Sequence, residues 1–527
     1  MNYVPEYSYC SRMFLVSISV IIISFIAIIN SLTSPGQFTI SGPGLLPDKY
    51  ILPCRYFFIQ STSSSSKVNI SKNDVEVSII GEDDNQRICR AHTELLQISD
   101  GYFLVRYKLY YSCHHLEISV KISGEHVANS PARVNDVAHP DTCNCPQQKL
   151  DSWLETTCPD MPTPSQMKED LDKFSDGVDM RSVVMEAKRR LSHGGSQCWC
   201  HYAVKNGLVY RQCFGQHVGF NMFWDNVLGW LARRAKIPDL EIIVNLGDWP
   251  LIKTGSGSLA RLPMISWCGS EDTEDMLVPT YELTEASIEC MGRQSLDVLA
   301  SLGRNEVAWE DKVETLFWRG RDSNRNRLKL AKISKENSDL INASITAFFF
   351  FRDEEAKLGK SPHVPFFDFF NYKYQLCIDG TVAAYRLPYL LAGGSVVFKQ
   401  ESKYYEHYYK DLHPWKHFIP VKEDLSDLVE KIEWAKNNDE KARKIAENAR
   451  QFAINNLLPD HVLCYHGAFL DKWSKLISNK VEIGDEMELV QINKNSDVRF
   501  KPCSCKMDID IDYNNNASSQ QLTKDEL

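Results

Sequence analysis

A cluster of arginines follows an apolar run in the second half of the chain. Arg319, Arg321, Arg325 and Arg327 fall within nine residues, directly after the apolar residues 313–318. Guanidinium groups pair with phosphate oxygens through charge-assisted hydrogen bonds, each worth about 1.5 to 3 kcal/mol. Because the cluster adjoins the end of an expected strand and not an exposed helix face, the sequence favours an anionic ligand over a solvated run of charge.

A second segment with the same preference spans residues 374–398. Its pattern is that of a strand, a turn at Gly380, a helix beginning near Thr381 and a second strand, with Arg386 one turn into the helix. The free N–H groups at a helix N-terminus and the helix dipole attract phosphate. An ordinary βαβ unit with a capping threonine has the same spacing, so both interpretations stay open on spacing alone.

A carboxylate stands at the end of a third apolar run. Asp248 belongs to the sequence Asn-Leu-Gly-Asp-Trp-Pro, close behind residues 240–246. At such a strand end a carboxylate can accept a proton from a substrate hydroxyl, although an aspartate beside glycine and proline is more often a turn or cap residue. Together, the three segments predict a cleft with a carboxylate on one wall and arginines with a helix terminus on the other.

This cleft suits transfer from a nucleotide diphosphate donor without a metal. No Asp-X-Asp motif stands at an expected strand end, and Asp508, Asp510 and Asp512 lie in the polar C-terminal tail, where solvation is the simpler interpretation. We therefore expect arginine and a helix dipole to neutralise the departing diphosphate. Neither a metal nor another cofactor is expected.

The elements that must position these residues are alternating strands and helices. Continuous apolar runs at residues 240–246, 313–318 and 395–398 are typical of buried parallel strands. Residues 425–452 carry a helical apolar stripe with an interruption expected near residues 437–438. Roughly 300 residues of such α/β units imply two doubly wound sheets. Ligands gather at the carboxyl ends of the strands in open sheets of this kind.

A different pattern precedes this α/β region. Between residues 34 and 134, short β-rich runs are separated by turn signals, which indicates an immunoglobulin-like sandwich. Residues 118–134 run from a strand through a glycine turn to Ser-Pro and resemble the last strands of filamin-type repeats. No catalytic constellation occurs there, so we expect a structural or docking module. Residues 138–164, rich in proline, cysteine, aspartate and threonine, are the expected linker.

The two ends of the chain indicate the secretory pathway. Lys524, Asp525, Glu526 and Leu527 form a KDEL retrieval signal, which a receptor reads in the lumen of the endoplasmic reticulum. Residues 13–29 are an almost unbroken apolar run, readable as a signal peptide or a signal anchor. We favour cleavage, because retrieval suits a freely diffusing protein, and we expect residence in the endoplasmic reticulum lumen.

Composition agrees with a folded protein of that compartment. The 527 residues are 43% hydrophobic and carry a net charge of −10, which argues against a nucleic-acid partner. Sixteen cysteines include CxC pairs at 143/145, 198/200 and 503/505, but no partners stand at zinc spacing, so disulfides are expected. Sequons for N-glycosylation begin at Asn69, Asn342 and Asn516.

Five segments carry a resemblance to a known family: WRGRDS (318–323), FFDFF (366–370), DGTVAAYRLPYLL (379–391), YYEHYY (404–409) and PWKHFIPVK (414–422). Over residues 143–480 the chain resembles the CAP10, or glycosyltransferase-90, family of protein O-glucosyltransferases. Its β-rich module and KDEL end are similar to one branch of that family. The resemblance implies a metal-independent, inverting enzyme of the GT-B type, which moves glucose from UDP-glucose to a serine of folded EGF-like repeats.

The resemblance also implies roles for single residues. Asp248 matches the catalytic base, which deprotonates the acceptor serine as it attacks the anomeric carbon opposite UDP. Arg319, Arg321 and Arg327 match positions on the UDP-sugar side; Arg321 replaces a serine of the shorter relatives, and an arginine suits the same phosphate role. The segment implied to bind the nucleotide sugar consists of Thr381, Val382, Ala383, Ala384, Tyr385 and Arg386, with Arg386 as the diphosphate clamp.

The resemblance implies a chain of five parts. Separately, a disulfide from Cys143 or Cys145 to Cys464 is plausible by position. Within the catalytic region, residues 201–305 are the acceptor side, 306–460 the UDP-sugar side and 460–480 a closing helix. The five parts are residues 1–33 (signal peptide or anchor), 34–136 (filamin-type immunoglobulin-like domain), 137–200 (linker and lead-in helices), 201–480 (catalytic region) and 481–527 (polar tail with the retrieval signal).

Two other functions remain open from the sequence. UDP-xylose as the preferred donor is one, because a single hydroxymethyl group offers a pocket little to discriminate. A non-catalytic luminal chaperone or binding protein is the other. The expected partners of the enzyme are UDP-glucose, folded EGF-like repeats and the KDEL receptor.

Overall fold

The computed structural model describes most of the chain between residues 37 and 490. No helix in this part combines the length and apolar character needed to cross a membrane. Several expectations fall outside it: the apolar run 13–29, the sequons at Asn69 and Asn516, the CxC pair 503/505 and the tail ending in Lys524, Asp525, Glu526 and Leu527. The described residues are 37–62, 70–89, 91–146, 148–159, 161, 163–191, 198–216, 218–255, 261–291, 296–303 and 307–490.

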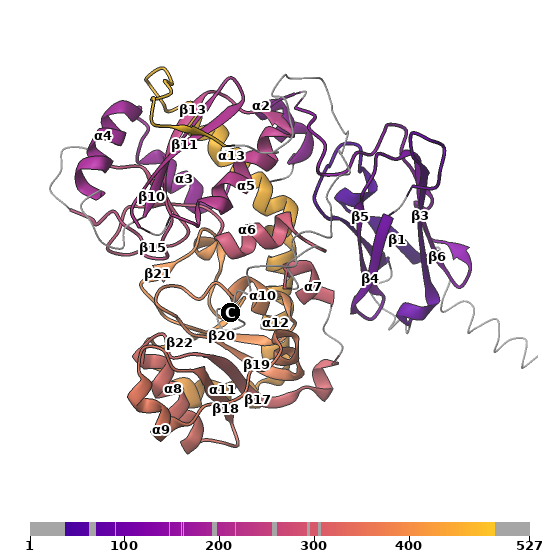
Figure 1. Ribbon diagram of the computed structural model, residues 1–527. Helices are drawn as coiled ribbons and strands as arrows, with labels where there is room; N and C mark the ends of the chain where they lie inside the picture. The colour runs from indigo at the N-terminus through magenta and orange to yellow at the C-terminus, as the bar shows by residue number, and fades with distance from the viewer. Residues whose placement is uncertain are drawn as a thin grey trace, which may run out of the picture.

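The N-terminal part consists of two antiparallel sheets that share one apolar core. One sheet has the order β1-β2-β5-β4, and the other pairs β6 with β3, β7 and β8. A disulfide between Cys89 and Cys113 joins this part internally. Figure 1 shows it beside the rest of the molecule. Its strands are β1 (Phe38–Ser41), β2 (Arg55–Ser61), β3 (Val75–Glu82), β4 (Ala91–Ser99), β5 (Tyr102–Leu109), β6 (His114–Ile122), β7 (Glu125–His126) and β8 (Ala132–Arg133).

A helical segment leads from the β-rich part into the α/β region. Cys158, at the end of α2, forms a disulfide with Cys464 of α13, because the two helices pack against each other. The predicted bridge from Cys143 or Cys145 to Cys464 is therefore wrong, although both cysteines are disulfide-bonded. The elements are β9 (Gln148–Lys149), α2 (Leu150–Thr157), α3 (Ser165–Asp172), α4 (Met180–Leu191) and, later in the chain, α13 (Pro459–Ser474).

The first α/β half has a six-stranded mixed sheet of order β16-β14-β13-β10-β11-β23. Strands β13, β14 and β16 are parallel, whereas β10 pairs antiparallel with both β11 and β13. The parallel strand expected at residues 240–246 is confirmed by β13, but β10 and β11 make this sheet mixed and not fully parallel. The elements are β10 (Trp199–Lys205), β11 (Leu208–Phe214), α5 (Asn221–Ala232), β12 (Ala235–Lys236), β13 (Leu240–Asn245), β14 (Met264–Ser266), β15 (Gly269–Ser270), β16 (Met276–Leu277), α6 (Tyr281–Ile288), α7 (Val298–Gly303) and β23 (Glu488–Leu489).

The second half has a five-stranded, fully parallel sheet of order β18-β17-β19-β20-β22. The order reverses between β17 and β19, and ligands of open α/β sheets bind in the crevice at such a switch point. The elements are β17 (Val313–Arg321), α8 (Arg325–Glu336), β18 (Ile341–Ala347), α9 (Glu355–Leu358), β19 (Tyr372–Cys377), α10 (Leu387–Ala392), β20 (Val396–Gln400), β21 (Tyr404–Tyr405), β22 (Ile419–Val421), α11 (Leu428–Asn437) and α12 (Asp439–Asn456).

Two helix predictions in this half had different outcomes. The expected interruption near residues 437–438 is confirmed, because α11 ends at Asn437 and α12 begins at Asp439. The helix predicted to begin near Thr381 is wrong. Residues 379–386 form turns and bends, and α10 begins only at Leu387, with Arg386 as its N-cap residue.

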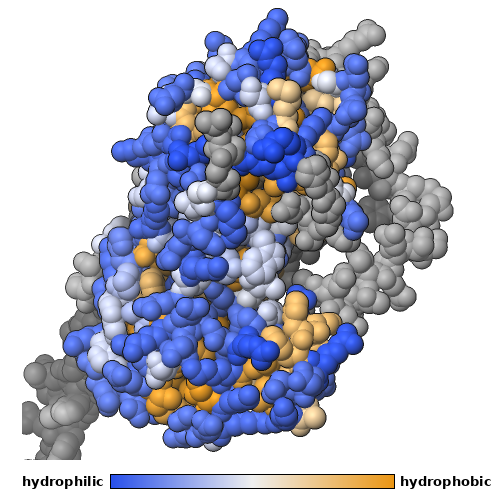
Figure 2. All heavy atoms as spheres, turned by 90° about the vertical axis from the view of Figure 1, so that its left-hand side faces the viewer, coloured by the Kyte–Doolittle hydropathy of each residue, from blue (hydrophilic) through white to orange (hydrophobic). Residues whose placement is uncertain are grey.

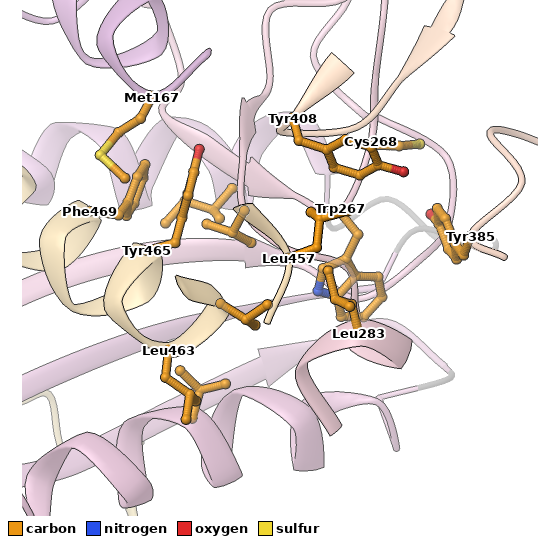
Figure 3. Packing of buried hydrophobic residues seen from close by; sticks show 14 of the residues in the cluster. Met167, Trp267, Cys268, Leu283, Tyr385, Tyr408, Leu457, Leu463, Tyr465 and Phe469 are labelled. Carbon is orange, nitrogen blue, oxygen red and sulfur yellow. The ribbon is translucent and has the colours of Figure 1, made fainter. Parts of the chain in front are cut away.

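The two halves are joined by contacts near the middle of the molecule. Strand β15 of the first half pairs antiparallel with β21 of the second. One apolar cluster continues through both halves, and Figure 3 shows Trp267 and Cys268 of the first half together with Tyr385 and Tyr408 of the second. Helix α13 follows the second half in sequence and packs on α2, α6 and β13 of the first. Figure 1 shows the two halves one above the other, with β15, β21 and α6 between them.

Candidate active site

Asp248 lies in a turn that begins where β13 ends. The side chain of Asn245 closes this turn: its Nδ2 donates to the carbonyl of Trp249 at 2.7 Å, and its Oδ1 accepts the N–H of Gly247 at 2.9 Å. The thiol of Cys268 donates to the backbone carbonyl of Asp248 at 3.2 Å. Because buried side chains hold the backbone on both sides, the position of the Asp248 carboxyl group is fixed by the neighbouring strands.

A second layer of hydrogen bonds holds the chain beyond this turn. The Nδ2 of Asn245 also donates to Ser266 Oγ at 3.1 Å, and Ser266 Oγ donates to Asp275 Oδ1 at 2.7 Å. The Asp275 carboxylate in turn accepts the backbone N–H groups of Leu251 and Ile252 at 2.9 and 2.8 Å. This network runs from β13 through β14 to the segment before β16, so the turn is anchored to three strands of the sheet.

The carboxyl group of Asp248 has the features of a proton acceptor. Its Oδ1 is buried and makes no hydrogen bond to any described residue. Burial raises the pKa of the group above the usual aspartate value. A carboxylate with a free lone pair and a raised pKa is suited to general base catalysis on a hydroxyl group.

The opposite wall is formed by the chain that follows β17. Asp322 is fully buried, and its carboxylate accepts the N–H groups of Phe349, Phe350 and Phe351 at 2.9, 2.9 and 2.6 Å. This arrangement fixes the loop after β18 beside Arg321. The Arg321 guanidinium lies 5.9 Å from the ring centre of Phe349, is exposed, and has no hydrogen bond or ion pair to the described residues. It is therefore available to an anion.

Arg386 lies beside Arg321 at the same end of the sheet. Its Nη1 donates to the carbonyl of Arg319 at 2.7 Å, and its other N–H groups have no protein partner among the described residues. Burial lowers the pKa of the Arg386 guanidinium, Cys377 and Glu282 oppose this shift, and the like charge of Arg321 adds to it. Because the charge of Arg321 lowers the pKa of Arg386, the two guanidinium groups lie near each other. Together they can bind a doubly charged anion such as a diphosphate.

Arg327, predicted to bind the nucleotide sugar, makes several hydrogen bonds within the protein. It is buried at the switch point, where its Nε donates to the carbonyl of Asp379 at 2.7 Å and its Nη1 to the carbonyl of Arg321 at 3.0 Å. Further bonds go to Ser323 Oγ and to the carbonyl of Ile378, both at 3.2 Å. Four of its five N–H groups are thereby committed, so Arg327 ties the ends of β17 and β19 together.

Arg319 is likewise engaged with the protein. Its Nη1 donates to the carbonyl of Asn342 at 2.8 Å and its Nη2 to Asn342 Oδ1 at 2.7 Å. The Nδ2 of Asn342 donates to the hydroxyl of Tyr372 at 3.3 Å. Asn342 begins one of the expected N-glycosylation sequons, and an oligosaccharide on its Nδ2 would have to displace the hydrogen bond to Tyr372.

The predicted nucleotide-sugar segment is a turn at the end of β19. Asn324 donates from Nδ2 to the carbonyls of Asp379 and Gly380, each at 2.8 Å, and Gly380 N–H donates to the carbonyl of Val382 at 2.9 Å. Because a side chain from the start of α8 binds these carbonyls, the segment is held in a tight turn and not in a helix. Thr381 is half-buried, and Val382, Ala383, Ala384 and Tyr385 are buried.

Tyr281 and Glu282, at the start of α6, connect the two walls. The ring of Tyr281 lies 5.7 Å from that of Tyr385 in an edge-on contact. Glu282 is exposed at the start of α6, but the protein around it still desolvates its carboxyl group and raises its pKa; Arg386 opposes this shift, Asp248 adds to it and Arg321 opposes it. A single carboxylate therefore feels the charge of the candidate base and of both free arginines. The Asp248 wall and the arginine wall therefore both lie close to Glu282.

Tyr281 and Glu282 were not predicted from the sequence. The only local signal is Thr280, whose side chain caps α6 by accepting the N–H of Leu283, and a capped helix predicts no chemistry. Trp249 was noted only as a neighbour of Asp248; it is exposed and contacts Tyr404 across the halves at 5.9 Å. Figure 2 shows a largely hydrophilic face of the molecule, with hydrophobic residues exposed in patches.

Two further features bear on ligands. Among the described residues, no three histidine, cysteine or acidic side chains gather as a metal site requires. A cavity of about 390 Å³ lies elsewhere, between the linker at Pro164 and α12, with His407, His413 and His417 in its lining. It contains neither Asp248 nor any of the arginines, so we assign the chemistry to the two facing walls on the basis of their charged groups.

Comparisons with known proteins identify the family. Residues 154–508 match the family model described as glycosyl transferase family 90. Protein O-glucosyltransferase 2 of Danio rerio is 44% identical over 469 residues, 88% of this chain and 91% of the relative. Protein O-glucosyltransferase 3 of Homo sapiens is 40% identical over 467 residues, 87% of this chain and 91% of the relative. The shorter protein O-glucosyltransferase 1 of Rattus norvegicus is 29% identical over 331 residues, 60% of this chain and 80% of that protein.

The match to the family model covers more than half of the chain, and its range includes both walls of the candidate site, from Asp248 to Arg386. The chain belongs to glycosyl transferase family 90 and is a glycosyltransferase.

Proposed function

We propose that the enzyme transfers glucose from UDP-glucose to a serine hydroxyl of a folded EGF-like repeat. The names of the relatives, protein O-glucosyltransferases at 40 and 44% identity over most of the chain, support glucosylation of a protein acceptor. One arrangement supports the assignment of residues: Glu282 lies near Asp248, whose Oδ1 has no partner among the described residues, and near Arg321 and Arg386, of which Arg386 makes one hydrogen bond to the protein.

The mechanism that these residues support is a single displacement. Asp248 takes the proton of the serine hydroxyl as its oxygen bonds to the anomeric carbon of glucose. The bond from that carbon to the UDP oxygen breaks on the opposite face, so the configuration inverts. Arg321 and Arg386 stabilise the negative charge that develops on the diphosphate, because charge-assisted hydrogen bonds strengthen as the charge grows. Arg327 and Arg319 hold the loops in place.

We propose that this charge neutralisation requires no metal ion. Two guanidinium groups supply the positive charge that a divalent cation provides elsewhere. Of the residues predicted to bind the nucleotide sugar, we retain Arg321, Arg386 and the turn from Thr381 to Tyr385 as direct contacts. In the finer classification, we propose a GT-B arrangement of the two α/β halves and a filamin-type N-terminal sandwich.

The proposed compartment is the lumen of the endoplasmic reticulum. The terminal KDEL sequence and the N-terminal apolar run support this location, and the KDEL receptor would be the partner that retrieves the protein. The disulfides Cys89–Cys113, Cys158–Cys464 and Cys200–Cys213 are consistent with an oxidising compartment. Within the sequons, we keep Asn69 and Asn342 as proposed glycosylation sites, of which Asn342 would have to give up the hydrogen bond from its Nδ2 to Tyr372.

The experiment that tests the proposal is transfer with competing donors. The purified chain is incubated with a folded EGF-like repeat and equal amounts of UDP-glucose and UDP-xylose, with and without EDTA. We expect the mass of one hexose on a single serine, unchanged by EDTA. Addition of a pentose would identify UDP-xylose as the preferred donor. Loss of activity in EDTA would contradict the metal-free mechanism. If no sugar is added, the result would favour a binding protein.

A further inference from the structure

The N-terminal sandwich is packed firmly against the catalytic region. Arg106 of β5 donates from Nη1 to Asp297 Oδ2 at 2.9 Å, and this ion pair is buried between the two parts. Leu96 of β4 lies so close to α7 that a Cβ atom on Gly303 would be 2.3 Å from the Cβ of Leu96. Such a packed interface fixes the position of the sandwich on the catalytic region. Two independent domains joined only by a linker would not need it.

Two cysteine thiols meet in this interface. Cys54 directly precedes β2 of the sandwich, and Cys290 follows α6 of the catalytic region. Both side chains are fully buried thiols in one apolar cluster, and Cys54 is close enough to Cys290 to raise the pKa of its thiol. The Nη1 of Arg106 also donates to Cys290 Sγ at 3.5 Å. A pair of adjacent thiols from segments 236 residues apart is a candidate for a covalent link.

We propose that Cys54 and Cys290 form a disulfide that ties the sandwich to the catalytic region in the mature protein. The step is thiol–disulfide exchange: one cysteine attacks a small or protein disulfide of the oxidising compartment, and one thiol of that reagent leaves. The second cysteine then attacks the mixed disulfide, which forms the Cys54–Cys290 bond and releases the second thiol. Two electrons and two protons pass from the cysteine pair to the reagent.

The surroundings determine when this bond forms. The hydrogen bond with Cys54 and burial raise the pKa of the Cys290 thiol, and Arg106 opposes that shift. A thiol that is protonated and inaccessible reacts slowly, because the thiolate is the nucleophile. The pair therefore closes while the two parts dock during folding, and once buried it resists both reduction and further oxidation.

The bond also restrains the catalytic site, because Cys290 lies just after α6 and the other end of this helix contributes to the site. Cys290 comes two residues after the last residue of α6, and the first two residues of that helix are Tyr281 and Glu282, which lie between the two walls. A covalent link at one end of an eight-residue helix restricts the movement of its other end. The sandwich thus acts as a brace for the element that connects the base to the arginines, a function that we assign beyond the transfer reaction.

Disulfide mapping of the full-length, unreduced protein from an oxidising host tests the proposal. The protein is denatured with an alkylating reagent present, digested and analysed by mass spectrometry before and after reduction. We expect the peptides with Cys54 and Cys290 to appear as one linked species that separates on reduction. Cys377, a buried thiol in β19, is the internal control and should be alkylated. Alkylation of Cys54 and Cys290, or a link from either to another cysteine, overturns the proposal.

Variants separate a covalent bond from a simple contact. Cys54→Ser, Cys290→Ser and the double variant each retain a polar group of similar size, so a hydrogen-bonding role alone predicts almost unchanged melting temperatures. For a disulfide we expect losses of several degrees that are the same in all three variants, since each removes the same bond. Unchanged or additive losses contradict the proposal, and if a variant does not fold, mapping of the wild-type chain still decides. Transfer activity is measured separately, so loss of the proposed function would not be mistaken for loss of the bond.

Discussion

The carboxamide of Asn245 bonds to the carbonyl of Trp249 at 2.7 Å and so closes the turn that presents Asp248. Asn245 is almost fully buried at the end of β13, and it also contacts Ser266 in the neighbouring strand. The position of the proposed base therefore depends on a side chain that does not contact substrate. This relationship separates two roles, holding the base and accepting the proton, which substitutions can test independently.

Asn245→Ala should impair the chemical step without impairing donor binding. The substitution leaves the carbonyl of Trp249 and the N–H of Gly247 without their partner, and each lost hydrogen bond at this part-buried position costs about 0.5 to 1.5 kcal/mol. We expect kcat to fall by at least tenfold, the melting temperature to fall, and the Kd for UDP to remain the same. Kinetics on an EGF-like repeat and calorimetry with UDP give these values. A wild-type kcat would show that the turn does not need Asn245.

Asp248→Asn should abolish transfer while the fold is retained. The amide has the same shape but cannot accept a proton, and loss of a general base typically costs about 10² to 10⁴ in rate. UDP binding and melting temperature should match those of the wild type, because the Oδ1 of Asp248 has no protein partner to lose. Asp176→Asn, at an exposed position, is the matched control. Near-normal turnover of Asp248→Asn would remove Asp248 from this role.

Arg321 and Arg386 should behave as ligand contacts, whereas Arg327 should behave as a structural residue. Arg386→Ala and Arg321→Ala should each raise the Kd for UDP by about tenfold or more, since each removes a charge-assisted contact to phosphate. Their melting temperatures should change little, because the guanidinium of Arg321 has no protein partner and that of Arg386 has one. Arg325→Ala, on the exposed side of α8, is the control and should bind UDP normally. Unchanged UDP affinity in both variants would place the diphosphate elsewhere.

Arg327→Ala should instead destabilise the protein. Burial lowers the pKa of Arg327 to about 9, and four of its N–H groups hold carbonyl or hydroxyl oxygens near the ends of β17 and β19. Losing these bonds should lower the free energy of unfolding by about 3 kcal/mol or more. Urea unfolding measures it, and UDP binding should weaken as a consequence. A stable variant with weak UDP binding would show that Arg327 is a direct contact after all.

The ends of the strands could be predicted from the sequence because buried parallel strands are continuous apolar runs. Asp248 and the arginines after residue 318 were proposed as site residues in this way, since ligands gather where such strands end. Tyr281 and Glu282 could not be found, because α6 comes to the site only through tertiary packing. The turn at Thr381 was mistaken for a helix because Asn324, more than fifty residues earlier, binds the carbonyls that a helix would have used.

The mixed first sheet and the disulfide from Cys158 to Cys464 were also not predicted. Strands β10 and β11 make the first sheet mixed, and their connection through Asn206 and Gly207, both with positive φ of 51° and 76°, is the Asn-Gly hairpin signal that the sequence does contain. The bridge from Cys158 to Cys464 was missed because it depends on the packing of α2 against α13. Pairing of cysteines distant in sequence follows from the tertiary structure and is not readable from spacing.

The pH dependence of transfer should reflect the raised pKa of Asp248. The base works only when ionised, and burial raises its pKa, so kcat/KM should fall on the acid side at a higher pH than the usual value of about 3.9 for aspartate. Below that point the logarithm of kcat/KM should lose about one unit per pH unit. The Kd for UDP, measured over the same pH range, is the control. A flat profile down to pH 4 would contradict a base in this environment.

The buried Glu406 should make the stability of the protein depend on pH. Burial raises its pKa to about 8, hydrogen bonds from Tyr409 and Tyr408 oppose this shift, and Glu282 adds to it. The folded chain therefore keeps a proton that the unfolded chain releases near pH 4.5, so folding must take up a proton between these values. Stability contributed by the protonated group is complete below pH 4.5 and declines as the pH rises towards 8.

Glu406→Gln removes this ionisation and should restore the stability that the wild type loses as the pH rises. The variant should match the wild type at pH 5 and exceed it by on the order of 1 kcal/mol or more at pH 8, because a pKa difference of one unit corresponds to about 1.4 kcal/mol. Urea unfolding at pH 5, 6.5 and 8 measures the difference, and Glu433→Gln, at an exposed position on α11, should show none. A stability difference that does not change with pH would mean that Glu406 is already ionised in the folded protein, which its unpartnered, buried Oε2 argues against.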